Sequence, residues 1–223
     1  DYKQFVNECL KRYGTGAEEI SLVKIDPNTI SITSDVMDQL QALAIERSGE
    51  ELSAQVRVSS GSQYGIYILQ IKEEGISAFK VTLIHRGSKG EEIPFELSRE
   101  SKGTRRLLEL LPMFFDFASI PLNGEGFGRS RGREQVYVVD ELDMSFHSAL
   151  TAKLIEDCVA CCSADTRTQL IFSTQDLVIL DSDVLRHDEI WFCERDGEDT
   201  SSLSCLGNHP GIRGDSDVLK NYL

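Results

Sequence analysis

A short apolar run that ends in two adjacent carboxylates constrains this chain more than any other feature. The run comprises residues 136–139, Val-Tyr-Val-Val, and Asp140 and Glu141 follow it directly. Such a run predicts a buried strand, whose carboxyl end then presents both acidic side chains. Asp140 is suited to hold Mg²⁺, usually through water, because this ion keeps much of its hydration shell. Glu141 is suited to take a proton from an attacking water, although a strand end can also be acidic without any chemical role.

The residues that follow this strand predict an α/β arrangement. After the two carboxylates the chain turns, and Ser145 is expected to cap a helix that runs from Phe146 to about Cys162. The next apolar run, from Gln169 to Ser173, is expected to form a strand parallel to the first, which completes a βαβ unit. Ligands of such sheets gather at the carboxyl ends of the strands. The two carboxylates and Gln175 are therefore expected to lie near one another.

The rest of the chain is expected to add strands and helices around this unit. Alternation of apolar and polar residues predicts strands over residues 20–25, 30–33, 52–59, 67–72, 79–86, 93–97, 190–194 and 202–206. Apolar residues at helical spacing predict helices over residues 1–13, 35–47, 102–117 and 217–222. Pro112 is expected to bend the third of these helices or to end its regular part.

The charge balance limits the kinds of partner. With 37 acidic and 23 basic residues the formal net charge is −14, which argues against broad binding to a phosphate backbone. The loop over residues 121–134 carries Arg129, Arg131 and Arg133, which belong either to a plain surface loop or to a local contact with nucleic acid or an acidic partner. No apolar run approaches the roughly 18 residues of a membrane-spanning helix, so no membrane contact is expected.

The start of the chain and its cysteines bear on its origin and compartment. The sequence opens at Asp1 without a methionine or a signal-peptide pattern, so we expect a piece of a longer protein. Cys158, Cys161 and Cys162 share one face of a predicted helix. We expect them to pack in the core rather than to bind a metal, because no second Cys or His pair lies at ligand spacing. Six cysteines used in this way suit the reducing cytoplasm.

A second stretch, Ser101-Lys102-Gly103-Thr104, is expected to open the helix over residues 102–117. Ser101 is a suitable N-cap, and Gly103 leaves the first turn bare. The N-terminus of a helix offers N–H donors and a partial positive charge, hence a site for an anion, and Lys102 adds a full charge. A capped helix without a ligand is the alternative.

The order of three stretches resembles a known family. Ser-x-Gly-Thr opens a helix, Asp-Glu-Leu-Asp ends the next strand, and Ser-Thr-Gln-Asp ends the strand after it. This order is similar to that of the C-terminal half of ABC-type ATPases. It most closely resembles the bacterial ABC-like ATPases grouped with the overcoming-lysogenization-defect and abortive-infection ATPases, which are cousins of the SMC and double-strand-break-repair ATPases. The resemblance covers roughly residues 78–223 and implies the C-terminal lobe of a P-loop NTPase, an α/β sheet with flanking helices. Residues 1–77 would then be an inserted, β-rich and helical arm or subdomain.

The resemblance also implies a role for each matching residue. The signature motif, which contacts ATP, corresponds to Ser101, Lys102, Gly103 and Thr104. In the Walker B motif, Asp140 corresponds to the metal carboxylate and Glu141 to the catalytic base. Asp143 corresponds to the D-loop aspartate, with Ser145 and His147 continuing into the helix, and Gln175 occupies the position of the switch-loop histidine. Residues 185–192 resemble the strand that follows the switch loop in this subgroup.

Two departures from the family pattern matter. Gln175 stands where the family usually has a histidine that contacts the γ-phosphate. Glutamine can donate a hydrogen bond but cannot carry charge or relay a proton, so hydrolysis is expected to be slow or to be replaced by nucleotide-gated switching. No Gly-x-x-x-x-Gly-Lys-Ser/Thr segment occurs in these 223 residues. We expect the phosphate loop upstream of Asp1 or on another chain, and we expect these residues alone neither to bind ATP tightly nor to turn it over.

In such ATPases two heads sandwich two nucleotides. The resemblance therefore implies a homodimeric switch gated by ATP and Mg²⁺, which in antiphage defence would control a nuclease or toxin. Three alternatives stay open. The first is a catalytically degenerate ATP sensor or scaffold, and the second is a DNA-repair ATPase, against which the acidic balance counts. The third is a metal-dependent nuclease built from Asp140, Glu141, Asp143 and Asp176.

Overall fold

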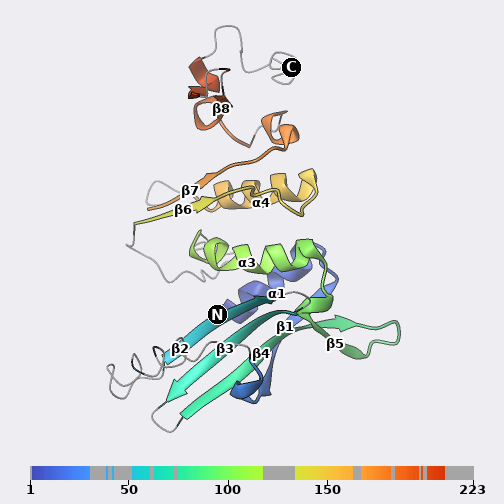
Figure 1. Cartoon of the computed structure of the whole chain (residues 1–223). Coiled ribbons are helices and arrows are strands. Elements are labelled where there is room, and N and C mark those ends of the chain that lie inside the picture. Colours follow the sequence, from blue (N-terminus) through green and yellow to red (C-terminus); the bar gives the residue numbers. More distant parts are fainter. Residues whose placement is uncertain are drawn as a thin grey trace. The chain divides into compact units, whose positions relative to one another are not determined.

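The computed structural model describes residues 2–30, 39, 42, 52–60, 63–72, 75–117, 134–162, 167–181, 184–195, 197 and 200–208. The chain divides into two compact units, Asp1–Glu109 and Leu110–Leu223 (Figure 1). Helix α3 (Lys102–Phe117) begins in the first unit, and its last turns belong to the second.

The first unit is built on an antiparallel sheet. Its strands are β1 (Ala17–Ile25), β2 (Leu52–Ser60), β3 (Gln63–Lys72), β4 (Gly75–Arg86) and β5 (Glu92–Glu96). They lie in the order β1-β4-β3-β2, and β5 also pairs with β4. The middle of β4 is buried on both of its sides, at Val81, Thr82 and Leu83. Because β4 pairs with three neighbours, it is the strand around which the unit is arranged.

Helix α1 (Tyr2–Arg12) packs along β1 and confirms the helix expected over residues 1–13. Its buried residues are Phe5, Val6, Cys9 and Leu10, which recur at helical spacing. The Asn7 side chain accepts a hydrogen bond of 2.8 Å from the backbone N–H of Ile20 and so joins the helix to the strand. A separate apolar cluster forms around Ile30, Leu69 and Ala78.

The second unit contains the expected βαβ arrangement. Strands β6 (Gln135–Val139) and β7 (Thr168–Phe172) are parallel and in register from Gln135 with Thr168 to Val139 with Phe172. Helix α4 (Ser148–Ala160) connects them and buries Thr151, Leu154, Ile155 and Cys158. An antiparallel hairpin of β8 (Trp191–Arg195) and β9 (Ser201–Cys205) follows, as expected. Short 3-10 helices are η1 (Pro27–Thr29), η2 (Leu97–Arg99), η3 (Leu177–Asp181), η4 (His187–Glu189) and η5 (Leu206–Asn208).

One expectation about β6 is wrong. The strand was expected to be buried, but Val136 and Val138 are 58% and 75% exposed, and Ile171 of β7 is 57% exposed. These three residues lie on one face of the two-stranded sheet, whereas Tyr137 and Val139 on the other face are half-buried. Parallel sheets are usually covered on both faces. The described residues cover only one face of the sheet formed by β6 and β7.

Two local expectations also need correction. The N-cap of α4 is His147, without a side-chain hydrogen bond, and Ser145 lies earlier in the turn with a φ of 72°. A residue at that φ belongs to a left-handed turn rather than to a cap, whose backbone is usually extended. Helix α3 continues past Pro112 to Phe117, so the proline does not end it. Ile30, the first residue of the strand expected over residues 30–33, follows η1 with an extended backbone.

Some expectations fall outside the described residues. They concern residues 31–33, most of the helix expected over 35–47, the arginines Arg129, Arg131 and Arg133, and the helix expected over 217–222. Strands from both sides of the expected boundary at 77/78 form the sheet of the first unit, and that boundary stays a prediction. In the described part of the chain, no helix is long and apolar enough to span a membrane.

Candidate active site

The carboxyl ends of β6 and β7 form the centre of the candidate site. Val139 and Phe172 are the last paired residues of the two strands, so Asp140 and Ser173 leave the sheet side by side. Asp140, Glu141, Ser173 and Gln175 are all exposed. This edge carries the residues that the sequence predicted to lie together.

Ser173 joins the two strand ends through four hydrogen bonds to four consecutive residues. Its N–H donates to the carbonyl oxygen of Val139 at 3.0 Å, and its carbonyl oxygen accepts from the N–H of Leu142 at 3.0 Å. Its Oγ donates to Asp140 Oδ1 at 2.5 Å and accepts from the backbone N–H of Glu141 at 2.8 Å. The sequence assigned no role to Ser173, because none of these contacts can be inferred from spacing alone.

Glu141 has an unusual backbone conformation. Its φ is 48°, in the left-handed region, which is unfavourable by roughly 1–2 kcal/mol for a residue with a Cβ. Gln175 Nε2 donates to Glu141 Oε1 at 3.1 Å, so the glutamine expected at the switch position contacts the carboxylate expected to be the base. Strained conformations of this kind persist where the surrounding structure imposes them, and they cluster at functional sites.

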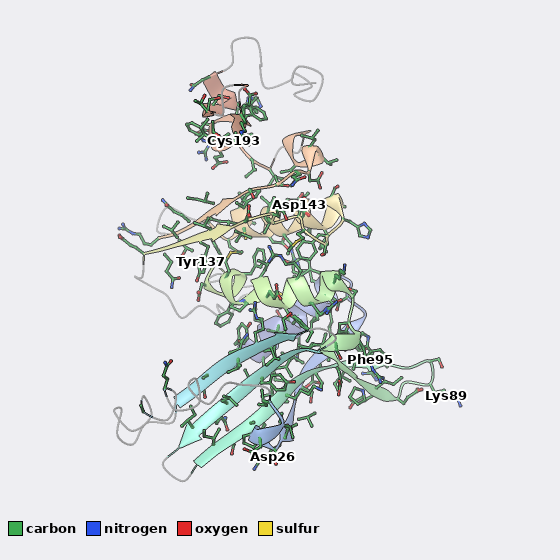
Figure 2. All side chains as sticks on the ribbon, in the orientation of Figure 1. Asp26, Lys89, Phe95, Tyr137, Asp143 and Cys193 are labelled. Carbon is green, nitrogen blue, oxygen red and sulfur yellow. The ribbon has the colours of Figure 1, made fainter. Side chains whose placement is uncertain are left out.

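The turn after Glu141 is anchored in the core by Leu142, which is fully buried. Asp143, the expected D-loop aspartate, lies in this turn between β6 and α4 (Figure 2). Its backbone carbonyl accepts from the N–H of Phe146 at 2.9 Å. Its Oδ1 is buried and has no hydrogen-bond partner among the described residues, which makes Asp143 a polar group with unused capacity.

Asp176 serves a structural purpose in the same loop. Its carboxylate accepts from the N–H of Val178 at 3.0 Å, at the start of η3, and its own N–H donates to Thr174 Oγ1 at 3.0 Å. In the described ranges, no group of three or more His, Cys, Asp or Glu side chains is arranged to hold a metal ion. The clustered carboxylates expected of a metal-dependent nuclease are therefore not gathered in this part of the chain.

The site nevertheless suits one hard cation held largely by water. Asp140 is an exposed carboxylate bonded to the Ser173 hydroxyl, and Glu141 follows it in the chain. Mg²⁺ takes oxygen ligands and usually binds through one or two carboxylates together with waters and phosphate oxygens. The donor set thus fits Mg²⁺ when a nucleotide supplies the remaining ligands.

The strand that carries Asp140 is tied to helix α3. The Tyr137 hydroxyl donates to Asp116, and the rings of Tyr137 and Phe117 lie 6.1 Å apart. Burial, and then the bond to Asp116, raises the pKa of Tyr137 to about 12. These contacts fix the half-buried face of β6.

The expected helix tip is present in the first unit. The Ser101 Oγ accepts from the N–H of Thr104 at 2.9 Å and lies 2.8 Å from its Oγ1, which confirms Ser101 as the N-cap. Ser101 and Lys102 are exposed, Gly103 is half-buried and Thr104 is buried. The first N–H groups of a helix have no intrahelical acceptors. The tip belongs to the first unit, whereas Asp140, Glu141, Asp143 and Gln175 belong to the second.

A hydrogen-bonded pair with a buried carboxylate lies directly before this tip and was not expected from the sequence. Glu100 is 9% exposed, and its Oε1 lies 2.6 Å from Nε2 of His85 on β4. The His85 ring also packs on Phe95, with centroids 4.6 Å apart. The contact joins the loop before Ser101 to the central strand, and only the register of β4 with β5 could have revealed it.

A second polar network joins α3 to the β2–β3 hairpin. The Tyr64 hydroxyl donates to Glu109 Oε1 at 2.8 Å, and the guanidinium of Arg105 lies 4.9 Å from the centroid of the Tyr64 ring. Burial, followed by the bond to Glu109, raises the pKa of Tyr64 to about 12.

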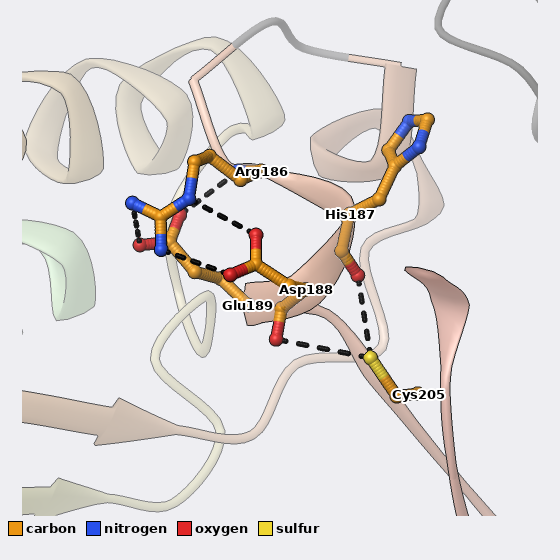
Figure 3. Close-up of polar contacts among 5 residues, drawn as sticks. All are labelled: Arg186, His187, Asp188, Glu189 and Cys205. Carbon is orange, nitrogen blue, oxygen red and sulfur yellow. Dashed lines mark hydrogen bonds and ion pairs between the residues drawn. The ribbon is translucent and has the colours of Figure 1, made fainter. Parts of the chain in front are cut away.

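Within the stretch over residues 185–192, Arg186 and η4 form a tight polar turn (Figure 3), and β8 begins at Trp191. Arg186 pairs with Asp188 and Glu189, and its backbone N–H donates to Glu189 Oε2 at 2.9 Å. The Cys205 thiol donates to the carbonyl oxygens of His187 and Asp188 at 3.6 and 3.8 Å. The polar residues of this stretch therefore serve to form the turn.

The three cysteines expected in the core only partly lie there. Cys158 is buried, Cys161 is half-buried and Cys162 is exposed. Helix α4 ends at Ala160, so the last two cysteines lie beyond the regular turns that would have aligned them with the first.

Residues 16–181 match the family described as "AAA domain, putative AbiEii toxin, Type IV TA system". No curated protein matches the chain. The match includes the helix tip at Ser101, the β6 edge with Asp140 and Glu141, and the loop with Gln175.

Proposed function

The chain belongs to the AAA-domain family that its residues 16–181 match, and we propose that it forms part of an ATP-hydrolysing head that works in pairs. Membership places the chain among P-loop ATPases, whose domains generally bind ATP with Mg²⁺. The finer proposal is an ATP-gated homodimer that acts in the cytoplasm in antiphage defence and controls a nuclease or toxin effector.

The observation that carries the proposal is the arrangement at the ends of β6 and β7. Asp140 is bonded to Ser173, and Glu141 is bonded to Gln175. Asp140 would hold Mg²⁺, which would supply positive charge to stabilise the phosphate oxygens, including those of the leaving ADP. Glu141 would orient an attacking water and accept its proton. Gln175 would donate its amide N–H to Glu141 or to a phosphate oxygen.

The helix tip would act on the nucleotide of the partner head. Ser101 and Gly103 would contact the γ-phosphate through hydroxyl and backbone N–H groups, and Lys102 would add positive charge. Thr104 supports the tip from within, since its own hydroxyl is bonded to Ser101. Asp143, whose buried Oδ1 has no hydrogen-bond partner among the described residues, would take a donor when two heads pair. Phosphate binding would then hold two heads together, which is a conformational switch.

Mutation of Glu141 in the protein of full natural length tests the proposal. Glu141→Gln should abolish phosphate release and, with ATP and Mg²⁺, trap a dimer that light scattering detects. Glu134→Gln is the matched control, because Glu134 precedes the opposite end of β6 and is exposed. If Glu141→Gln hydrolyses ATP at the rate of the control, the assignment of the base is wrong.

A second candidate is a catalytically degenerate ATP sensor, and Gln175 is the observation that favours it. A sensor would bind ATP and dimerise without releasing phosphate, whereas a slow ATPase would show single-turnover release. Gln175→His should raise the rate of a slow ATPase, because histidine can relay a proton near neutral pH. Dimerisation by ATP without measurable turnover in either variant would favour the sensor.

A further inference from the structure

The four hydrogen bonds of Ser173 fall on four consecutive residues of the proposed catalytic strand end. We propose that Ser173 is a positioning residue, which orients the Asp140 carboxylate and fixes the backbone of Glu141. This inference rests on the function proposed above and names a residue to which that function assigns no part.

The Ser173 hydroxyl has one proton and two acceptor lone pairs. Since the backbone N–H of Glu141 can only donate, the hydroxyl must accept from it at 2.8 Å. The hydroxyl proton then goes to Asp140 Oδ1 at 2.5 Å, within the range of hydrogen bonds to an ionised carboxylate. The direction of both bonds is therefore determined, and the carboxylate is held at one oxygen.

The same hydroxyl supports the left-handed backbone of Glu141. A φ of 48° is unfavourable for glutamate, so the turn would relax if its tethers were removed. The backbone bonds of Ser173 to Val139 and Leu142 hold the flanking residues but do not reach Glu141 itself. Without the Oγ, the N–H of Glu141 loses this acceptor, and the backbone that carries the carboxylate toward Gln175 loses one of its tethers.

Ser173 is exposed, which makes a conservative replacement feasible. Ser173→Thr keeps the hydroxyl and adds a methyl group at a position open to solvent. Ser173→Ala removes the hydroxyl and both of its bonds but leaves the backbone bonds intact. Thr168→Val is the matched control, because it removes a hydroxyl at the opposite end of the same strand.

The experiment compares these variants with wild type in the protein of full natural length. Removing an outer-shell partner of a metal ligand typically lowers activity or metal affinity about 10–100-fold. We expect Ser173→Ala to lower kcat by about that factor. We also expect it to weaken the binding of Mn²⁺ by a similar factor, which electron paramagnetic resonance measures in the presence of a non-hydrolysable ATP analogue. Hydrogen exchange of the Glu141 amide without nucleotide should accelerate in Ser173→Ala only. Ser173→Thr and Thr168→Val should behave like wild type.

The outcomes separate this inference from the function on which it rests. If Glu141→Gln abolishes hydrolysis while Ser173→Ala keeps wild-type kcat, Mn²⁺ affinity and amide exchange, the positioning role is refuted and the ATPase assignment stands. If Ser173→Ala and Thr168→Val lose activity equally, with equal losses of thermal stability, the effect is general destabilisation and the inference is also refuted. Hydrolysis by Glu141→Gln at the rate of the Glu134→Gln control overturns the assignment of the base on which this inference rests.

Discussion

Replacing Glu141 by glycine should make the protein more stable than replacing it by alanine. Both changes remove the carboxylate and its hydrogen bond with Gln175, so that loss cancels in the comparison. What differs is the Cβ atom, which alanine keeps at a φ of 48° and glycine lacks. The pair therefore measures the backbone strain at this one position.

The expected size follows from two opposing effects. Removing the Cβ relieves roughly 1–2 kcal/mol of left-handed strain, while glycine loses about 0.5–1 kcal/mol more backbone entropy on folding than alanine. Glu141→Gly should thus exceed Glu141→Ala in free energy of unfolding by about 0.5–1 kcal/mol. Neither variant should hydrolyse ATP, because the proposed base is gone.

Urea unfolding followed by circular dichroism and by the fluorescence of Trp191, the single tryptophan, measures the difference. The midpoints should differ while the slopes stay equal, which shows that the compactness of the unfolded state is unchanged. An alanine variant as stable as the glycine variant would refute the reasoning, because Glu141 would then not be strained.

Three further predictions concern other parts of the chain. Ser101→Ala should lower the free energy of unfolding by about 1 kcal/mol, because the N–H of Thr104 loses its cap, and Ser101→Asp should restore most of it in calorimetry. A thiol reagent should label exposed Cys193 well before Cys158, since burial raises the pKa of the Cys158 thiol; mass spectrometry of short reactions reads this order. The pKa of Tyr64 is raised to about 12, mainly by burial. Because unfolding lets this phenol ionise near its ordinary pKa of about 10, its stabilisation is complete below that pH and is lost as the pH rises toward 12. In Tyr64→Phe, the free energy of unfolding should therefore depend less on pH between about 10 and 12 than in wild type, which urea unfolding at a series of pH values measures.

Much of the fold could be predicted because the apolar residues of its helices and strands recur at regular spacing in the sequence. Helix α3 occupies the residues at which its apolar spacing placed it, and Ser101 caps it, since a serine before a helical pattern is a local preference. The parallel pairing of β6 with β7 also follows from local patterns, because a strand, a helix and a second strand can form few other arrangements.

The cap of α4 could not be predicted in the same way. Local preference favoured Ser145, but the helix begins after His147 because the turn is set by contacts with another strand. The hydrogen bonds between Ser173 and residues 139–142 hold the start of that turn. The pair of Glu100 with His85 likewise depends on the register of strands, which no local pattern fixes.

The strain in this turn bears on function as well as on folding. Two residues with a Cβ, Glu141 and Ser145, have positive φ on either side of the fully buried Leu142. For folding alone, glycine or asparagine would serve better at both positions. The hydrogen bonds of Ser173 and the burial of Leu142 hold the turn around the glutamate at the first of them. Strain of this kind needs a reason outside stability, and a carboxylate directed toward Gln175 beside Asp140 supplies one. A stabilised turn with glycine at position 141 would keep the fold and lose the group that the proposed reaction requires.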